Sequence, residues 1–435
     1  MKTFNRILAF LFSLILLTFA GCGKQDDSGS HSGGKTEDVE IEIWISTVNQ
    51  PNYFIGWFKK AFEEANEGIK LKFTPSTNLG TGLDVLLDGK GAPDMAATSG
   101  GLVVPILQKG GRIVKLEDVI GSKKDTFHEV ALLNQIDNEF WCAPIFGFCS
   151  PVIFYNKTVF EANGLTVPSS YAELVSLCNS VKGIKDNGKQ KYQTIVTGYT
   201  YHVLQAMSGK TMSKEQLDAI IQPKTASATN PFDNDAMLNT YKWVEQMRKD
   251  GIFAQNLTGY TSESAANNFA TQKALMVMCP GLDLLDYSKS CNFEVGAFTL
   301  PDAPEAFATE GAQGGISGIY NDCLVVNSKS QHVEECKKVI EFMYSDAAQR
   351  ALFNSFLYPV VKNTSYENVD ASKKALFDAA FKPIYDEARD NGMSIFWMNY
   401  FYKSGLDSAC ETSFNAVINN SEIVEQAWAR LKNAW

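Results

Sequence analysis

The sequence contains no constellation of residues typical of covalent or metal-dependent catalysis. Its four histidines are scattered, and His332 with Cys336, on a predicted helix, lack the second pair of ligands that a zinc site needs. No nucleophile elbow or phosphate loop is present, and the glycines at 311–315 lack the spacing of a dinucleotide-binding loop. We therefore expect no metal, no cofactor and no catalytic residue. The many carboxylates could still supply a glycosidase-like pair, so a surface enzyme stays open as an alternative.

Hydrogen-bonding and aromatic side chains stand instead where predicted strands end. Asn49 and Tyr53 follow a predicted strand at 40–45. Phe146 comes shortly after Pro144, and Tyr199 comes directly after Gly198. Because ligands of doubly wound sheets bind at the carboxyl ends of strands, these residues are candidates for contacting a small molecule. Asn49 could equally be a turn or cap residue, and Phe146 could equally belong to the core.

The elements that would position these residues alternate between strands and helices. Alternating apolar residues predict a strand at 40–45, and apolar residues at helical spacing after Pro51 predict a helix that Gly68 ends. Ser170 with Glu173 forms the pattern of a helix-capping box. Further strands are predicted at 69–73, 94–97, 152–155, 274–278 and 293–298, and further helices at 157–162 and 235–249. This order predicts an α/β fold in which helices cover each sheet.

The length of the folded part predicts two lobes. From Val39 onward the chain has about 395 residues, more than one hydrophobic core usually supports. Because no long linker rich in Pro, Gly or Ser interrupts it, we expect two lobes joined tightly by several chain crossings.

The N-terminus has the pattern of a bacterial lipoprotein signal. Lys2 and Arg6 precede an apolar run over residues 7–19, which is too short to span a membrane, and Cys22 follows. We expect residues 1–22 to be the signal peptide with its cysteine and Cys22 to carry the lipid. Residues 23–38, which have no large apolar side chain, would form a flexible tether. The rest of the chain would then be extracytoplasmic, held at the outer face of the cell membrane by lipid rather than by a transmembrane helix.

Charge and cysteine content narrow the choice of partners. The net charge of −10 argues against nucleic acid, whose phosphates need a basic surface. Eight cysteines follow Cys22 without a disulfide-framework spacing, so buried free thiols are favoured over disulfides, which stay open.

Several motifs, in a fixed order, resemble those of family 1 extracellular solute-binding proteins, the sugar-binding lipoproteins of ABC importers that include maltose-binding protein. The resemblance rests on these segments: 139–145 (EFWCAPI), 155–164 (YNKTVFEANG), 269–276 (FATQKALM), the glycine pair at 314–315, 358–360 (YPV) and 393–397 (MSIFW). Each motif is weak alone, but their order spans residues 40–435.

The resemblance implies a two-lobed periplasmic-binding-protein fold of type II, with a ligand cleft at the hinge. Lobe 1 would comprise residues 39–152 and 301–358, and lobe 2 residues 153–300 and 359–435. The implied function is to capture a carbohydrate, most simply an oligosaccharide, by hinge closure and to deliver it to ABC transporter permease subunits as a monomer.

The resemblance also implies which residues contact the ligand. Thr98 and Ser99 occupy the place of sugar-contacting side chains after the third strand, and Trp397, with Tyr400 one turn on, matches a stacking tryptophan. Asp283 stands where the family has a stacking Trp, which suggests a carboxylate that binds hydroxyl groups. The remaining candidates from the family's arrangement and the strand ends are Asn49, Tyr53, Phe146, Tyr199 and Gly315. For Trp397, packing in the core stays an alternative.

Two other functions stay open besides the surface enzyme. The protein could bind a solute that is not a sugar, such as a peptide or polyamine, or act as a sensory lipoprotein that feeds no transporter.

Overall fold

The computed structural model describes residues 38–46, 52–221, 230–395, 397 and 405–435, and the part from Asp38 to Trp435 forms one unit by its internal contacts. Among these residues, no helix combines the length and the apolar character that crossing a bilayer requires. The predictions for Cys22 and the tether at 23–38 lie outside the described residues.

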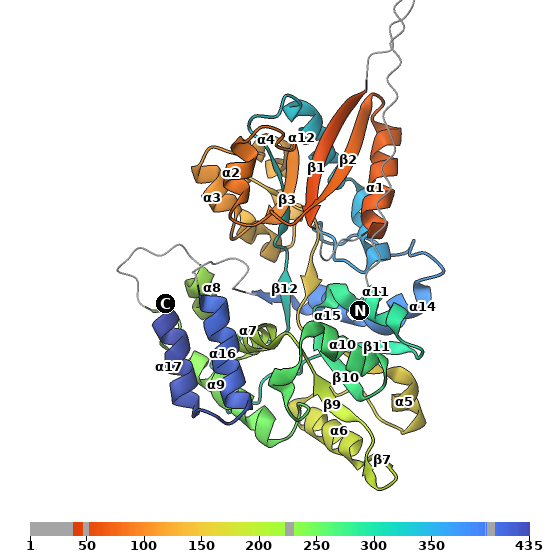
Figure 1. The fold of residues 1–435 in the computed structure, drawn as a ribbon, viewed down its shortest axis with the longest axis vertical. Coiled ribbons are helices and arrows are strands. Elements are labelled where there is room, and N and C mark those ends of the chain that lie inside the picture. Colours follow the sequence, from red (N-terminus) through yellow and green to blue (C-terminus); the bar gives the residue numbers. More distant parts are fainter. Residues whose placement is uncertain (1–37, 47–51, 222–229, 396, 398–404) are drawn as a thin grey trace, which may run out of the picture. The chain divides into compact units, whose positions relative to one another are not determined.

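The first lobe is built on a five-stranded sheet in the order β2-β1-β3-β13-β4 (Figure 1). Its strands are β1 (Val39–Ser46), β2 (Ile69–Ser76), β3 (Met95–Ser99), β4 (Ala143–Pro144) and β13 (Asp322–Val326). The first three run parallel, whereas β13 runs antiparallel to β3 and β4. Parallel neighbours place the carboxyl ends of β1 and β3 at the same edge of the sheet.

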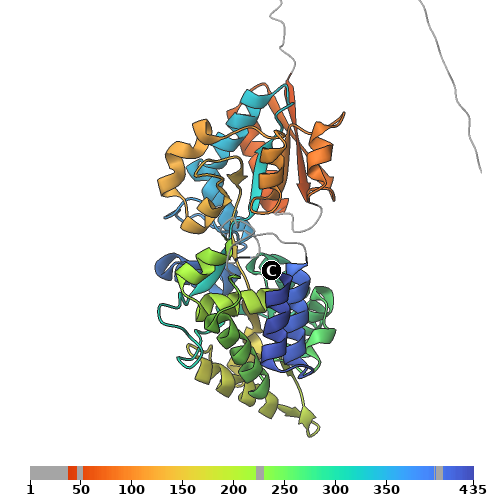
Figure 2. The ribbon, with the colours of Figure 1, turned by 90° about the vertical axis from the view of Figure 1, so that its left-hand side faces the viewer.

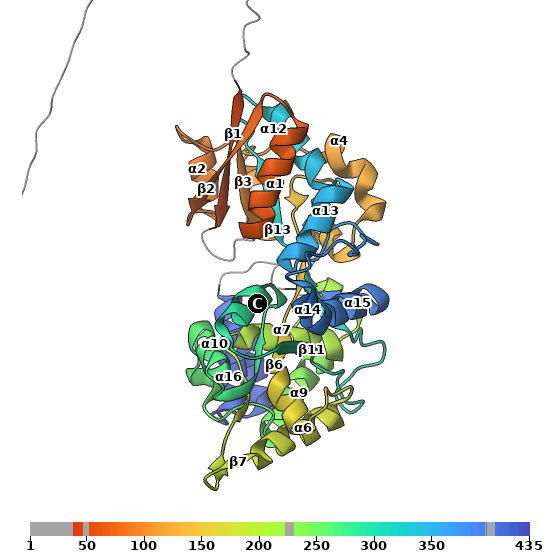
Figure 3. The ribbon, with the colours of Figure 1, turned by 90° about the vertical axis from the view of Figure 1, so that its right-hand side faces the viewer.

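Helices cover the first sheet, as the alternation of elements predicts. Figure 3 shows α1 along one face of this sheet, with α12 and α13 beside it. The helical segments of this lobe are α1 (Asn52–Ala65), α2 (Leu83–Asp88), α3 (Val104–Lys109), α4 (Glu117–Ile120), η1 (Gly121–Thr126), η2 (Glu129–Asn134), α12 (Val333–Met343), α13 (Asp346–Leu352) and η5 (Phe353–Ser355). Phe58 and Phe62 of α1 meet Phe342 of α12 edge to face, with ring centroids 5.5 Å apart in each pair. This aromatic contact fixes α1 on the sheet.

The second lobe is built on a four-stranded sheet in the order β11-β6-β10-β9. Its strands are β6 (Val152–Asn156), β9 (Gln193–Val196), β10 (Ala274–Cys279) and β11 (Val295–Thr299), and a small hairpin, β7 (Lys185–Asp186) with β8 (Lys189–Gln190), follows α6. Only β9 and β10 run parallel to each other within this sheet, so their carboxyl ends lie together.

Most of the helices belong to the second lobe. They are α5 (Lys157–Ala162), α6 (Tyr171–Gly183), α7 (Thr200–Thr211), α8 (Lys214–Ile221), α9 (Asp235–Lys249), η3 (Leu257–Gly259), α10 (Ser262–Ala270), η4 (Gly281–Asp283), α11 (Leu284–Ser290), α14 (Lys374–Leu376), η6 (Phe377–Phe381), α15 (Lys382–Asn391), α16 (Leu406–Ile418) and α17 (Val424–Ala434). Figure 2 shows α16 and α17 side by side, in blue. The predicted cap of α6 is present, since the Ser170 hydroxyl accepts from the Glu173 backbone N–H.

A third sheet, in the order β14-β12-β5, lies where the chain passes between the lobes. Its strands are β5 (Phe148–Cys149), β12 (Ile316–Ile319) and β14 (Met393–Ile395). The segment before β12, which the predicted division places in lobe 1, contacts lobe 2: the N–H groups of Thr309 and Gln313 donate to the carbonyls of Thr211 and Met212 at the end of α7. The chain therefore returns to lobe 1 through β12, and residues 309–313 belong with lobe 2.

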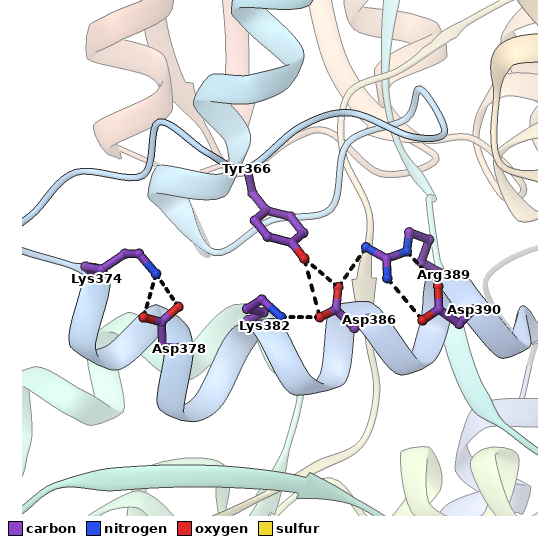
Figure 4. Close-up of polar contacts among 7 residues, drawn as sticks. All are labelled: Tyr366, Lys374, Asp378, Lys382, Asp386, Arg389 and Asp390. Atoms are coloured by element: carbon purple, nitrogen blue, oxygen red, sulfur yellow. Dashed lines mark hydrogen bonds and ion pairs between the residues drawn. The ribbon is translucent and has the colours of Figure 1, made fainter.

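The helix from residue 374 to 391 contains one wide π-turn, η6, before Pro383. Proline has no N–H to donate and its ring crowds the preceding turn, which accounts for the local widening. On the outer face of this helix, Asp386 accepts from Lys382, Arg389 and Tyr366 (Figure 4). These charges neutralise each other at the surface, so this face offers no strong field to a ligand.

The cysteines after Cys22 are free thiols, as the sequence favoured. Seven of the eight are buried, and Cys291 is half-buried. Burial raises the pKa of the Cys178 thiol to about 12, so this thiol is not a reactive thiolate at neutral pH.

Candidate functional site

An apolar cavity of about 220 Å³ opens at the carboxyl ends of β1 and β3. We call it the apolar cavity. Its apolar lining consists of Ile43, Ile45, Phe54, Ile55, Phe58, Phe73, Ala97, Ile145, Phe146, Phe148, Leu282, Leu324, Val339 and Met343, and its polar lining of Ser46 and Asp322. Leu282 comes from η4 of the second lobe, whereas β5 contributes Phe148 and the first lobe contributes the rest. The lining therefore includes both lobes, which a site for hinge closure requires.

The pairing of β3 with β13 decides which side chains reach the apolar cavity. Ala97 pairs with Leu324, and Ser99 pairs with Asp322. Because side chains alternate along strands and directly paired residues share a face, these four lie on the cavity side. Thr98 therefore lies on the other side.

Asp322 is the only acidic residue that lines the apolar cavity among the described residues. Solvent reaches it, but the cavity walls surround it, and its carboxylate has no hydrogen bond or ion pair with any described residue. Burial among these walls raises the pKa of Asp322 to about 6. An unpaired, partly desolvated carboxylate can accept two hydrogen bonds from the hydroxyl groups of a ligand.

Asn321 fixes the turn beside this carboxylate. Its side-chain amide donates to the Ser99 hydroxyl over 2.7 Å, and its Oδ1 accepts from the Gly101 N–H over 2.9 Å. A Cβ on Gly100 would lie 2.0 Å from Oδ1 of Asn134, so only glycine fits there. Asp322 is thus held by a rigid turn and not by its own side-chain contacts.

The second lobe presents a hydrogen-bonded pair of predicted site residues. Tyr199 precedes α7 after β9, Asp283 ends η4 after β10, and the Tyr199 hydroxyl donates to Asp283 Oδ2 over 3.1 Å. Burial raises the pKa of Asp283 to about 6 although the hydrogen bond from Tyr199 acts in the opposite direction. The sequence predicted both residues separately, and the structure joins them next to Leu282, which lines the apolar cavity.

The other predicted residues of the first lobe have different surroundings. Phe146 lines the apolar cavity, as one of its two sequence interpretations expected. Thr98 is buried and donates its hydroxyl hydrogen to the Leu79 carbonyl over 2.6 Å, so it is a structural residue in this conformation. Ser99 lies on the cavity side, where its hydroxyl already accepts from Asn321.

Gly315 does not line the apolar cavity. Its N–H donates over 3.1 Å to Asp302, which also forms an ion pair of 2.9 Å with the buried Lys210. Its φ of 69° explains why glycine occurs there. Gly315 therefore lies apart from the apolar cavity in this structure, and its contact with a ligand stays a prediction.

Trp397 is a core residue in this structure. It has 0% exposed surface, its indole N–H donates to the Ser208 hydroxyl over 2.9 Å, and its ring packs on Phe232. Neither ring face is open to a ligand, so the expected stacking role is not supported and the alternative of core packing describes this conformation. Asn49 and Tyr400 lie outside the described residues. Tyr53 belongs to α1, but its side chain also lies outside them.

Sequence reasoning missed Asp322, the carboxylate of the apolar cavity. The available signal was its position at the start of a strand, directly before the apolar run 323–326. That pattern shows a strand edge but not the register with Ser99, which is a long-range property.

The described residues offer little support for catalysis or metal binding. They contain no group of three or more His, Cys, Asp or Glu side chains arranged to hold a metal ion. Ser150 and His202 are 2.5 Å apart and resemble a nucleophile with its base. Both are buried, and burial lowers the pKa of His202 to about 3, so the pair lies where a substrate cannot reach it.

Comparison with known proteins gives a consistent result. The family model described as bacterial extracellular solute-binding protein matches residues 46–350. The multiple sugar-binding protein of Streptococcus mutans is 24% identical over 406 residues, which cover 88% of each chain.

Solved structures share the two-lobed α/β fold. The GacH receptor of Streptomyces glaucescens, studied without ligand and with acarbose, has a TM-score of 0.69 at 16% identity, over 92% of this chain and 98% of the receptor. The maltose/maltodextrin-binding domain MalE of Bdellovibrio bacteriovorus, bound to maltotriose, has a TM-score of 0.64 at 17% identity, over 91% and 98%.

Replacing Trp397 tests whether it supports the core or the ligand. Trp397→Ala should cost about 3–5 kcal/mol of unfolding free energy, because it leaves a large cavity. Trp397→Phe, which keeps a ring but leaves Ser208 without its donor, should cost less. Urea denaturation measures both. An alanine variant as stable as the wild type that has lost ligand affinity would restore the stacking role.

Replacing Asp322 tests whether its ionised carboxylate lowers the stability of the folded protein. Its pKa rises from 3.8 unfolded to about 6 folded, so the wild type loses stability as the pH rises through this interval. Asp322→Asn should therefore raise the unfolding midpoint of the ligand-free protein at pH 7.5, and the gain should vanish near pH 4. Thermal unfolding at several pH values measures it.

Asp302→Asn is the matched control for this measurement. Partial burial disfavours ionisation of Asp302, but the charge and hydrogen bond of Lys210 outweigh it and lower its pKa. This variant should lower the midpoint at pH 7.5, and its effect should fade in acid. A lower midpoint for Asp322→Asn at pH 7.5 would show that the fold needs this carboxylate.

Proposed function

Because the chain belongs to the family of bacterial extracellular solute-binding proteins, we propose that it captures a carbohydrate and delivers it to an ABC importer. The observation that carries this proposal is the apolar cavity, which both lobes line and which has the carboxylate of Asp322 in its lining. In the second lobe, Asp283 directly follows the lining residue Leu282 and accepts a hydrogen bond from Tyr199. Sugars present C–H faces and hydroxyl groups together, and such a lining suits both. The name of the Streptococcus mutans relative agrees with a sugar as the ligand.

Hinge closure is the proposed mechanism of capture. A ligand that bonds to Asp322 and Asp283 together would contact both lobes, and it would favour the conformation in which the two are close. It can shift that equilibrium only by its difference in affinity for the open and closed forms. The two carboxylates would supply such a difference if the ligand's hydroxyl groups reach both of them only in the closed form. The closed form would then dock, as a monomer, on the permease subunits.

The family indicates an extracytoplasmic location, and we propose that lipid on Cys22 holds the protein at the membrane. The support is the sequence of residues 1–22, in which a basic start and a short apolar run precede the cysteine. Residues 23–38 would allow the folded part to reach the importer.

A ligand panel tests the function. Thermal unfolding of residues 39–435 with mono- and oligosaccharides, amino acids, peptides and polyamines should show a raised midpoint with one glycan class. At 100 times its dissociation constant a ligand adds about 2.7 kcal/mol to stability, enough for a shift of several degrees. A shift only with a solute that is not a sugar would contradict the carbohydrate proposal.

Replacing Cys22 tests the anchor. In a bacterial host that processes lipoproteins, the full chain should partition into the detergent phase, whereas Cys22→Ala should remain unlipidated and lose this partitioning. Cys291→Ala is the control, because a half-buried thiol in the folded part should not affect it. Equal partitioning of wild type and Cys22→Ala would exclude a lipid on this residue.

A further inference from the structure

The apolar cavity has an interior in which the hydroxyl groups of a sugar would find no hydrogen-bonding partner among the described residues. Three of its lining residues, Phe58 of α1 and Val339 and Met343 of α12, are at most 4% exposed, and we call them its floor. Of the described residues that line the cavity, only Ser46 and Asp322 are polar. A hydroxyl group directed at this floor would lose its water without finding a partner, which costs on the order of 1–3 kcal/mol.

Polar character is confined to the mouth of the apolar cavity. Ser46 ends β1 and Asp322 begins β13, and both are exposed to solvent. Ile55 and Leu282, also lining residues, are half-buried, whereas the floor is closed. The cavity thus combines a polar entrance with an apolar interior.

We propose that the ligand is a glycoside with an apolar substituent, an aryl, alkyl or acyl group, which enters the apolar cavity while the sugar hydroxyl groups remain at Asp322. This inference rests on the proposed function, because it assumes that the polar part of the ligand is a sugar. It names the ligand class more narrowly than carbohydrate binding does.

The volume of the apolar cavity fits such a group. At about 220 Å³ it exceeds the engineered cavity of about 150 Å³, lined by similar side chains, that binds benzene. A phenyl ring or a short acyl chain would therefore fit without moving the core. Filling the space would also restore dispersion contacts that the lining side chains lack.

The charge of Asp322 at the mouth of the apolar cavity restricts the charge that the sugar part of the ligand can carry. Asp322 is acidic, and no Lys, Arg or His is among the described residues that line the apolar cavity. An anionic sugar, such as a uronate or a sugar phosphate, would meet a carboxylate without a compensating cation. The ligand is therefore neutral or cationic at its sugar end.

Matched glycosides test the proposal on the wild-type protein. The probes are methyl and phenyl glycosides of glucose, galactose, xylose and N-acetylglucosamine, with the corresponding free oligosaccharides, measured by calorimetric titration. For the sugar that binds, the phenyl glycoside should bind at least about tenfold more tightly than the methyl glycoside. Its binding should also show a more negative heat-capacity change, the signature of apolar burial.

A variant that fills the apolar cavity shows where the ring goes. Ala97→Leu adds apolar atoms on the cavity side of β3, so it should weaken the phenyl glycoside more than the methyl glycoside and thereby abolish the advantage of the phenyl group. Ala172→Leu, on the exposed side of α6, is the matched control and should retain the advantage. The thermal unfolding midpoint of each variant verifies that it is folded.

The outcomes separate this inference from the function. Equal affinity for methyl and phenyl glycosides would overturn the inference and leave carbohydrate binding in place. An advantage that persists in Ala97→Leu would also overturn it, because the ring would then bind elsewhere. No binding of any glycoside or oligosaccharide would overturn the proposed function, and the inference with it.

Discussion

The antiparallel pairing of β3 with β13 is the interaction on which the site depends. It joins Ser99 to Asp322, and the chain between them has crossed to the second sheet and returned. Asn321 adds the hydrogen bonds that hold the turn after β3. In this register the side chains of Ala97, Ser99, Leu324 and Asp322 lie on the same face of the sheet. A shift of the pairing by one residue would place the carboxylate of Asp322 on the opposite face.

The sequence carried enough local information to predict the elements, and less to predict the site. Helix α9 and strand β10 are defined by their own apolar spacing, so their predicted ranges agree closely with the structure. Tyr199 could be named as a candidate from its place after Gly198, and Asp283 from the position of a stacking Trp in the family that the chain resembles. Their hydrogen bond could not be predicted, since it depends on β9 and β10 being neighbours across a long stretch of chain.

Three of the predicted contact residues have partners in this conformation that the sequence did not indicate, and the physical cause is similar for each. Trp397 and Gly315 were chosen by resemblance in short motifs, but a motif does not say which partner a side chain has. The Trp397 indole has Ser208 and Phe232 as its neighbours, and the Gly315 N–H has Asp302. Thr98 lies on the side of the sheet away from the apolar cavity, because successive side chains of a strand point to opposite faces. Burial and side-chain partners are long-range outcomes of packing.

Two features of the candidate site, the unpaired carboxylate of Asp322 and the unfilled apolar cavity, are unfavourable for the stability of the free protein. A fold selected only for stability would pair the carboxylate of Asp322 or replace it, since desolvation without a partner favours the neutral acid. It would also fill the apolar cavity, because unfilled space forfeits dispersion contacts. Both deficits lie at the carboxyl ends of β1 and β3, and one amphipathic molecule could remove both. Hydroxyl groups would satisfy the carboxylate, and an apolar group would fill the space. Under the proposed function, a ligand that satisfies both would gain free energy that the open form does not supply, and hinge closure would require this difference in affinity.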